Sequence, residues 1–103
     1  MALSQDQKKH FRKIAHHLKP VVMIAENGIS DNVISETERA LEDHELIKVR
    51  INVLDREDKK TLVEALCNAT NAIQVQMIGK ISVLYRPARK QNRKLSNLVR
   101  FQG

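Results

Sequence analysis

The sequence predicts an α/β domain with two layers, in which helices and strands follow the order αβαβαββ and the strands form a mixed four-stranded sheet. Apolar residues recur at helical spacing in three segments, and they alternate with polar residues or run together in four shorter ones. Helical segments separate the first three strands, and such crossovers imply parallel pairing. A two-residue turn before the last strand makes that strand antiparallel.

The first helix is expected to begin after Ser4, because Ser4 and Gln7 have the spacing of a capping box. It is expected to end at Lys19, since Pro20 disfavours helical geometry in the residue before it. Its apolar face consists of residues three or four apart, namely Phe11, Ile14, Ala15 and Leu18. Basic residues at the same spacing form a cationic stripe on another face, namely Lys9, Arg12, Lys13 and His16. This stripe is either an ordinary solvated surface or a contact for a polyanion.

A unit of strand, tight loop and helix comes next. Four consecutive apolar residues, Val21–Ile24, predict a buried strand, and the turn residues Ala25–Gly28 follow it. Ser30 is expected to cap the helix behind the loop. Free backbone N–H groups and the positive end of the helix dipole would suit an anion such as phosphate here. An ordinary strand-to-helix turn is the alternative, and the carboxylate of Glu26 would repel an anion.

The second helix is expected at residues 31–43 and the second strand at residues 46–53. The buried face of the helix would consist of Val33, Ile34, Thr37, Ala40 and Leu41. Its outer face is acidic, which disfavours contact with a polyanion, and consists of Glu36, Glu38, Glu42 and Asp43. Alternation along the strand predicts a core face of Ile47, Val49, Ile51 and Val53 and an outward face of Lys48, Arg50 and Asn52.

Asp55 is expected to cap a third helix, and Asn71 is expected to end it in the left-handed conformation. The inner face of this helix would consist of Leu62, Ala65, Leu66 and Ala69. Two further strands are predicted at residues 73–78 and 81–85, joined by the turn Gly79-Lys80. If the second and third helices cover one face of the sheet, the other face is open and polar, with Lys48, Arg50, Asn52, Gln74, Gln76 and Ser82.

The net charge of +6 is unevenly distributed along the chain. Residues 1–20 carry +4, residues 21–85 carry −4 and residues 86–103 carry +6. Basic residues at both ends of a chain whose central part is mildly acidic indicate a polyanionic partner, either a nucleic acid or an anionic membrane surface. The single cysteine excludes an internal disulfide, and no apolar run approaches the length of a membrane span or a secretory signal. We therefore expect a cytoplasmic protein.

The chain is expected to divide into a domain at residues 1–87 and a basic, flexible tail at residues 88–103. The tail has too few apolar residues for a core of its own, so it is expected to be disordered in the free protein. Ordering on a polyanion is its functional interpretation, and a tail that serves only solubility is the alternative.

Several segments resemble the CRM domain, and within that family the small stand-alone bacterial YhbY-like RNA-binding proteins. These segments are residues 18–22 with the loop to Ser30, residues 40–49 and residues 76–87. The resemblance implies a fold similar to the C-terminal domain of translation initiation factor three. It also implies RNA binding and association with ribosomal RNA in precursors of the large ribosomal subunit, and hence a role in ribosome assembly.

The loop after the first strand departs from the family pattern, which is usually Gly-x-x-Gly and is compared with the phosphate-contacting loop of KH domains. Ala25 stands at the first glycine, and Glu26 stands at a position that is usually neutral or basic. Asn27 and Gly28 match the pattern. Because alanine tolerates most backbone conformations with negative φ, these two differences are expected to leave the fold intact. They affect how closely the loop can bind a phosphate.

No enzymatic chemistry is recognisable in the sequence. Cys67 has no basic partner that would activate it, so we interpret it as a structural thiol. The four histidines, at positions 10, 16, 17 and 44, lack metal-ligand spacing. Phosphate-binding, hydrolase and dinucleotide-binding motifs are absent from the sequence. We expect no enzyme activity, no metal, no cofactor and no small-molecule substrate.

The first functional hypothesis is a monomeric module that binds structured ribosomal RNA. The chain has only three aromatic residues, so recognition is expected to depend on the RNA backbone and shape. The expected contact residues are Lys9, Arg12, Lys13, Asn27, Gly28, Lys48, Arg50, Lys80, Arg86, Arg89 and Lys90.

Two alternatives remain open. In the first, the chain is a protein-interaction module that docks on a ribosomal protein through the acidic second helix, and its RNA contact is incidental. In the second, the first helix binds a membrane surface. The membrane alternative is disfavoured, because the apolar face of that helix is needed for the core.

Overall fold

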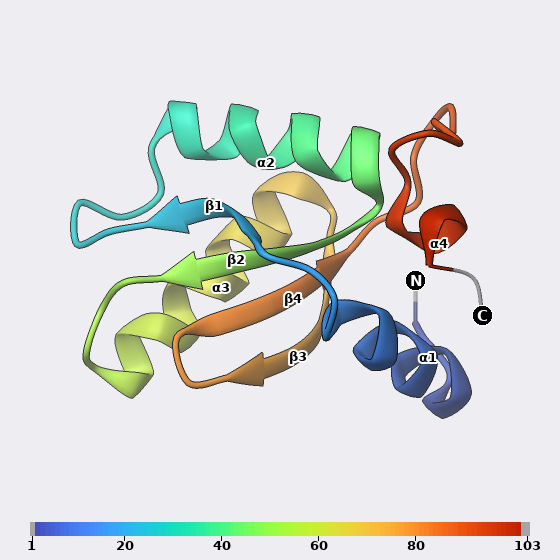
Figure 1. Cartoon of the computed structure of the whole chain (residues 1–103). Helices are drawn as coiled ribbons and strands as arrows, with labels where there is room; N and C mark the ends of the chain where they lie inside the picture. Colours follow the sequence, from blue (N-terminus) through green and yellow to red (C-terminus); the bar gives the residue numbers. More distant parts are fainter. Residues whose placement is uncertain (1, 102–103) are drawn as a thin grey trace.

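The computed structural model describes residues 2–101, and in it a four-stranded sheet carries helices on both faces (Figure 1). The elements follow the predicted order, with one short helix added near the C-terminus. They are α1 (Gln5–Ala15), β1 (Pro20–Ile24), α2 (Asp31–His44), β2 (Leu46–Ile51), α3 (Arg56–Thr70), β3 (Ile73–Ile78), β4 (Ile81–Tyr85) and α4 (Asn97–Arg100). The α/β class and the mixed four-stranded sheet are therefore confirmed.

The strands lie in the order β1-β2-β4-β3. β1 runs parallel to β2, and β4 runs antiparallel to both β2 and β3. The expectation of parallel pairing among the first three strands is wrong for β2 and β3, because β4 lies between them. The turn at Gly79, where φ is 56°, joins β3 to β4. β4 then pairs with β3 on one side and with β2 on the other. The last strand thus becomes a central one, and Ser82 and Leu84 are fully buried.

The main core lies between the sheet and the helices α2 and α3. α2 contributes Thr37, Ala40 and Leu41 as predicted. In α3 the predicted inner face is partly wrong, because the buried residues are Val63, Leu66 and Thr70, whereas Ala65 and Ala69 are exposed. This helix has two neighbouring apolar faces, one with Val63 and one with Ala65 and Ala69. The face with Val63 is the buried one, because a valine side chain removes more apolar surface from water than an alanine side chain does.

A second core cluster forms where α1 packs on the opposite face of the sheet (Figure 1). Phe11, Ile14 and Ala15 of α1 are buried there against β2, β3 and β4. The face that the sequence predicts to be open is therefore covered at one end by α1. The capping box that starts this helix is confirmed, but the helix ends at Ala15 rather than at Lys19.

A bulge in β3 changes which side chains reach the uncovered part of this face. Gln74 lies opposite Leu84 and Gln76 lies opposite Val83, so Val75 is an extra residue in the strand. Gln76 stays on the α1 side, as predicted. The prediction is wrong for Gln74 and Ser82, which hydrogen-bond to each other over 3.2 Å on the α3 side.

β1 is an edge strand, so the prediction of a buried strand is only half right. Val22 and Ile24 are buried, whereas Val21 and Met23 are 51% and 58% exposed. The loop behind it forms as predicted, since Ser30 caps α2 by accepting from the Val33 N–H.

The segment after Pro87, which the sequence predicts to be a flexible tail, makes hydrogen bonds and apolar contacts with the rest of the chain. Ala88 and Ser96 donate hydrogen bonds to the buried carboxylate of Glu45 over 2.9 and 2.8 Å. Leu98 and Phe101 pack against the cluster beneath α1. The few apolar residues of this segment complete an existing core, so they do not need one of their own. Residues 102–103, which the predicted tail includes, lie outside the described residues.

Candidate nucleic-acid interface

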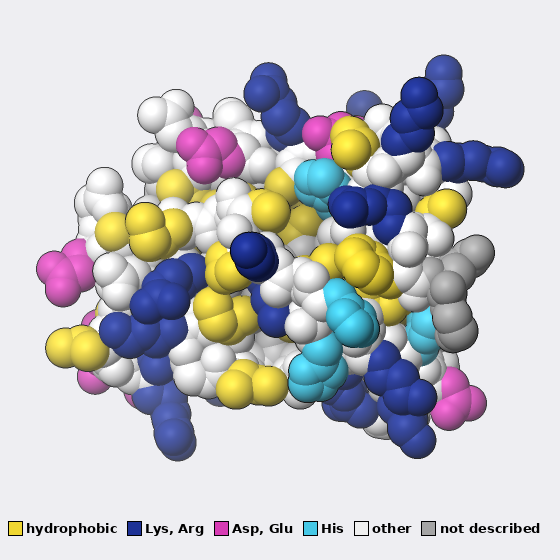
Figure 2. Space-filling model, in the orientation of Figure 1, with side chains coloured by type: hydrophobic (Ala, Val, Ile, Leu, Met, Phe, Trp, Pro, Cys, Tyr) yellow, Lys and Arg dark blue, Asp and Glu magenta, His cyan; other side chains and the backbone are white. Residues whose placement is uncertain are grey.

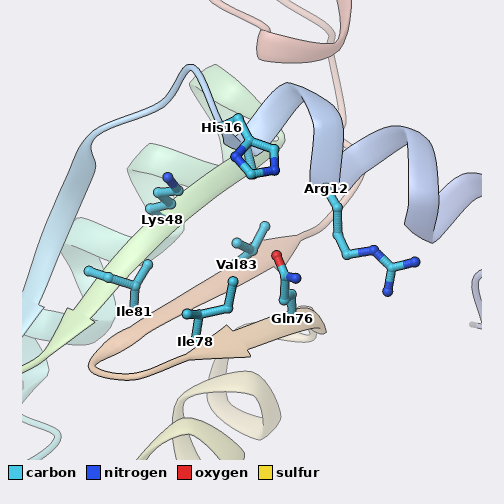
Figure 3. Close-up of a pocket in the computed structure, with 8 residues that line it drawn as sticks. Arg12, His16, Lys48, Gln76, Ile78, Ile81 and Val83 are labelled. Carbon is cyan, nitrogen blue, oxygen red and sulfur yellow. The ribbon is translucent and has the colours of Figure 1, made fainter.

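Helix α1 and strand β2 bring basic side chains from distant parts of the chain together. Burial of the apolar face of α1 against the sheet places Arg12 and His16 of its cationic stripe beside the uncovered sheet surface. Arg12 and Lys48 line the same open pocket, with His16 beside them (Figure 3). Lys9 and Lys13, also on α1, are exposed to solvent. Two residues of the cationic stripe, Arg12 and His16, therefore meet Lys48 of the outward face of β2.

A second group of cations lies farther along the same sheet face. Arg50 is exposed and lies directly opposite Ile81 in the antiparallel register, and Ile81 lines the pocket that contains Lys48. Directly opposed residues point to the same face of a sheet. Lys80 occupies the adjacent turn, where its Nζ lies 3.5 Å from Asn52 Oδ1.

The charges of these residues are not compensated by carboxylates. Among residues 2–101 both ion pairs involve Arg86, so Lys9, Arg12, Lys13, Lys48, Arg50 and Lys80 have no ion-pair partner there. Figure 2 shows Lys and Arg side chains in separate groups across this face, with histidines between them and with Asp and Glu mainly towards its margins. The face can therefore attract a polyanion.

Arg86 is engaged inside the fold and lies apart from this surface. Its guanidinium pairs with Glu38, lies 3.6 Å from the Glu42 carboxylate and donates to the Thr70 carbonyl over 3.0 Å. Its side chain is only 16% exposed. These contacts join α2, the end of α3 and the chain after β4, which is a structural role.

Arg89 and Lys90 lie beside the acidic side of α2. Their backbone N–H groups donate to the Glu42 carboxylate over 3.1 and 3.2 Å, while both residues remain exposed. These two hydrogen bonds, with a smaller contribution from the charge of Arg86, lower the pKa of Glu42. The two cations are thus adjacent to carboxylates, unlike those on α1 and β2.

The loop Ala25–Gly28 has acidic surroundings. Gly28 takes a φ of 81°, and its N–H donates to the Ala25 carbonyl over 3.0 Å, so this donor is already used. Glu26 lines an open pocket together with Asp55 and Asp58 at the start of α3. Three carboxylates around one pocket oppose a phosphate, so the structure gives no support for an anion site at Asn27 and Gly28.

Sequence reasoning missed two features near the predicted site. One is Glu45, which holds the C-terminal segment in place, and no local pattern marks it. The other is the apolar floor of the pocket between α1 and the sheet, formed partly by Ile78 and Ile81. Alternation along β4 could have indicated that Ile81 faces this side of the sheet. In β3 the bulge interrupts the alternation, so the orientation of Ile78 does not follow from the sequence.

The remaining chemistry-bearing groups have structural surroundings. Burial, with a smaller contribution from Glu64, raises the pKa of the Cys67 thiol to about 11, which makes it a poor nucleophile at neutral pH. Within residues 2–101 no three His, Cys, Asp or Glu side chains are grouped to hold a metal ion. In the same range no helix is long and apolar enough to cross a membrane.

Comparison with known proteins gives consistent matches over nearly the whole chain. The profile of the CRS1 / YhbY (CRM) domain matches residues 3–86. A probable RNA-binding protein of Pseudomonas aeruginosa is 50% identical over 103 residues, covering 100% of this chain and 99% of the relative. A probable RNA-binding protein of Bacillus subtilis is 39% identical over 93 residues, covering 90% and 96%. The solution structure of a Staphylococcus aureus protein, described as a candidate RNA-binding protein, superposes with a TM-score of 0.76 at 37% identity and covers 92% of this chain and 98% of its own.

Proposed function

Because the chain belongs to the CRS1/YhbY (CRM) domain family, we propose that it binds RNA through one surface built from α1, β2 and the β3–β4 turn. We call it the α1–β2 surface, and it consists of Lys9, Arg12, Lys13, Lys48, Arg50 and Lys80. The observation that carries the proposal is that Arg12 of α1 and Lys48 of β2 line one pocket, with Arg50 on the same face of the sheet. None of the three has an ion-pair partner among the described residues. The names of the relatives as RNA-binding proteins support the choice of RNA as the polyanion.

The binding mechanism is neutralisation of backbone phosphates by these six side chains. Each contact releases condensed counterions, so affinity falls as salt concentration rises. If about six phosphates are contacted, the logarithm of the affinity falls with the logarithm of the salt concentration at a slope of roughly −4 for a single strand. A response to salt close to zero would contradict this mechanism.

A paired charge reversal tests the surface. In the variant Arg12→Glu with Lys48→Glu, two phosphate contacts become repulsive, and we expect RNA affinity to fall at least about 10-fold with a shallower salt slope. The matched control is Arg56→Glu with Lys60→Glu on α3, which changes the net charge equally on the other side of the sheet. Fluorescence anisotropy with a labelled RNA hairpin measures both. Equal losses in the two variants would contradict a specific surface.

The proposed target is ribosomal RNA in precursors of the large ribosomal subunit, where the protein assists assembly in the cytoplasm. Family membership supports this target. Crosslinking the protein to RNA in cells and sequencing the bound fragments tests it directly. Fragments from ribosomal RNA of the large subunit are the expected result, and a set dominated by unrelated transcripts would contradict the assignment.

The alternative is a protein-interaction module that binds its partner through the acidic side of α2. Fewer carboxylates on that side are free to contact a partner than the sequence indicates. Glu38 and Glu42 are engaged by Arg86 and by the N–H groups of Arg89 and Lys90. Glu36 and Asp43 remain for a partner. Retained binding to ribosomal proteins by the α1–β2 charge-reversal variant, together with unchanged association with subunit precursors, would favour this alternative.

A further inference from the structure

The pocket between α1 and the sheet has an apolar floor inside the cationic surface. Its floor is formed by Ile78, Ile81 and Val83 (Figure 3). Ala15 of α1 also lines the pocket. Ile78, the last residue of β3, is 61% exposed, so the pocket presents apolar surface to solvent beside charged side chains. Phosphate contacts do not require such a floor, because phosphates interact with cations and hydrogen-bond donors.

Polar groups stand around this floor. Arg12 and Lys48 line the pocket from α1 and β2, and neither has an ion-pair partner among the described residues. Gln76 lies beside them, partly buried, and its side-chain amide makes no hydrogen bond to another described residue. That amide offers both a donor and an acceptor. The arrangement combines an apolar surface, one amide for polar recognition and two cations within the same small pocket.

We propose that this pocket holds one unpaired pyrimidine base of the bound RNA, a step that rests on the proposed RNA-binding function. The face of the base covers the isoleucines, its polar edge pairs with the Gln76 amide, and its flanking phosphates lie against Arg12 and Lys48. The pocket volume is about 150 Å³. A cavity of roughly that volume accepts one benzene-sized ring, so we assign a single-ring pyrimidine as its occupant. The protein therefore reads a bulged or looped-out base in addition to the RNA backbone.

Hairpin RNAs that differ at one position test this assignment. The probes are a hairpin with a single bulged uridine, the same hairpin with a bulged adenosine, and the same hairpin with an abasic ribose at the bulge. Burial of one base predicts that the wild-type protein binds the uridine hairpin about 10-fold more tightly than the abasic one. We expect the adenosine hairpin to bind no better than the abasic one. Equal affinity for uridine and abasic hairpins would overturn the base site, and equal affinity for adenosine and uridine would overturn its pyrimidine preference.

Two variants with matched controls locate the site. Ile81→Trp fills the pocket without changing its charges, and Gln76→Leu removes the amide at similar size. Each is expected to abolish the preference for uridine over the abasic ribose while leaving the salt slope unchanged. The controls are Leu54→Trp, at a residue that is 84% exposed beside the acidic loop pocket, and Gln74→Leu, in the same strand but on the α3 side. Loss of the preference in the controls, or its retention in both pocket variants, would overturn the location.

Failure of the base site can be separated from failure of RNA binding as a whole. The Arg12→Glu, Lys48→Glu variant weakens the binding of all three hairpins, the abasic one included, if the cationic surface is correct. If it weakens none, the proposed function itself fails. A direct readout that needs no variant is nuclear Overhauser contact between the uridine ring protons and the methyl groups of Ile78 and Ile81 in the complex. Contacts to these methyl groups support the site, and contacts to other methyl groups only would overturn it.

Discussion

Glu45 shows how one residue determines the course of the chain beyond β4. It follows α2 with a φ of 62°, a conformation that favours glycine or asparagine, and it is only 4% exposed. Its carboxylate accepts hydrogen bonds from the Ala88 N–H, the Gln91 amide and the Ser96 hydroxyl, and its carbonyl accepts from the Arg86 N–H. These bonds compensate the buried charge and the backbone strain.

Replacement of this residue gives a direct test at the residue scale. Glu45→Ala removes three hydrogen bonds to a carboxylate and leaves the buried Ser96 hydroxyl without its acceptor, so the free energy of unfolding should fall by about 2 kcal/mol. Urea denaturation followed by circular dichroism measures the change. Glu36→Ala, at an exposed position of the same helix, is the control and should have little effect. A loss no larger than that of the control would contradict the anchoring role.

The thiol of Cys67 provides a second test at this scale. Its pKa is raised from 9.0 to about 11, chiefly by burial. The thiolate is the reactive form, so alkylation by iodoacetamide at pH 8 should be about 100-fold slower than for an ordinary cysteine. Mass spectrometry of timed samples measures the rate, and the same reaction in urea is the control. A rate in the folded protein that equals the rate in urea would contradict the buried environment.

At the scale of elements, α2 is joined to the C-terminal segment by hydrogen bonds to a carboxylate. The N–H groups of Arg89 and Lys90 both donate to Glu42, and this lowers the pKa of that carboxyl below its ordinary value of 4.5. A lowered folded-state pKa means that the contribution to stability is present above pH 4.5 and is lost as the pH falls through the lowered pKa.

The amide NMR signals of Arg89 and Lys90 should therefore shift together during an acid titration, with a midpoint below pH 4.5. In the variant Glu42→Gln this common transition should disappear, because the glutamine amide does not titrate. A midpoint at or above 4.5 would show that the two hydrogen bonds do not favour the carboxylate, and the link between α2 and the segment would be weaker than the structure indicates.

At the scale of the whole molecule, α1, β2 and the C-terminal segment depend on one another. Leu98 and Phe101 pack on the cluster that also contains Phe11 and Leu46, and Phe101 stacks on His17 with ring centroids 5.6 Å apart. Helix α1, which carries part of the surface that we propose for RNA, therefore also depends on contacts with residues after position 87. A boundary at residue 87, as the sequence predicts, would cut through this cluster.

Truncation after Pro87 tests that dependence. Loss of the two packed side chains and of the Glu45 contacts should lower the free energy of unfolding by about 3 kcal/mol, with a matching fall in the thermal midpoint. Differential scanning calorimetry of the full chain and of residues 1–87 measures the difference. A thermal midpoint equal to that of the full chain would support the predicted independent domain with a flexible tail.

Features that depend on neighbouring residues could be predicted from the sequence. The caps at Ser4, Ser30 and Asp55 and the left-handed end at Asn71 all form, because each involves hydrogen bonds or dihedral preferences within a few residues. The positions of the strands followed from apolar periodicity. These choices are local, so the competing conformations can be compared without knowledge of the rest of the fold.

The tertiary structure alone decided the insertion of β4 between β2 and β3, the bulge at Val75 and the packing of the segment after Pro87. It also decided that Arg86 binds Glu38 inside the fold and that an apolar pocket lies within the cationic face. Each of these depends on residues far apart in the chain that compete for the same buried space or the same charge. Periodicity shows which side chains can be buried, but only the complete set of contacts determines what each one packs against.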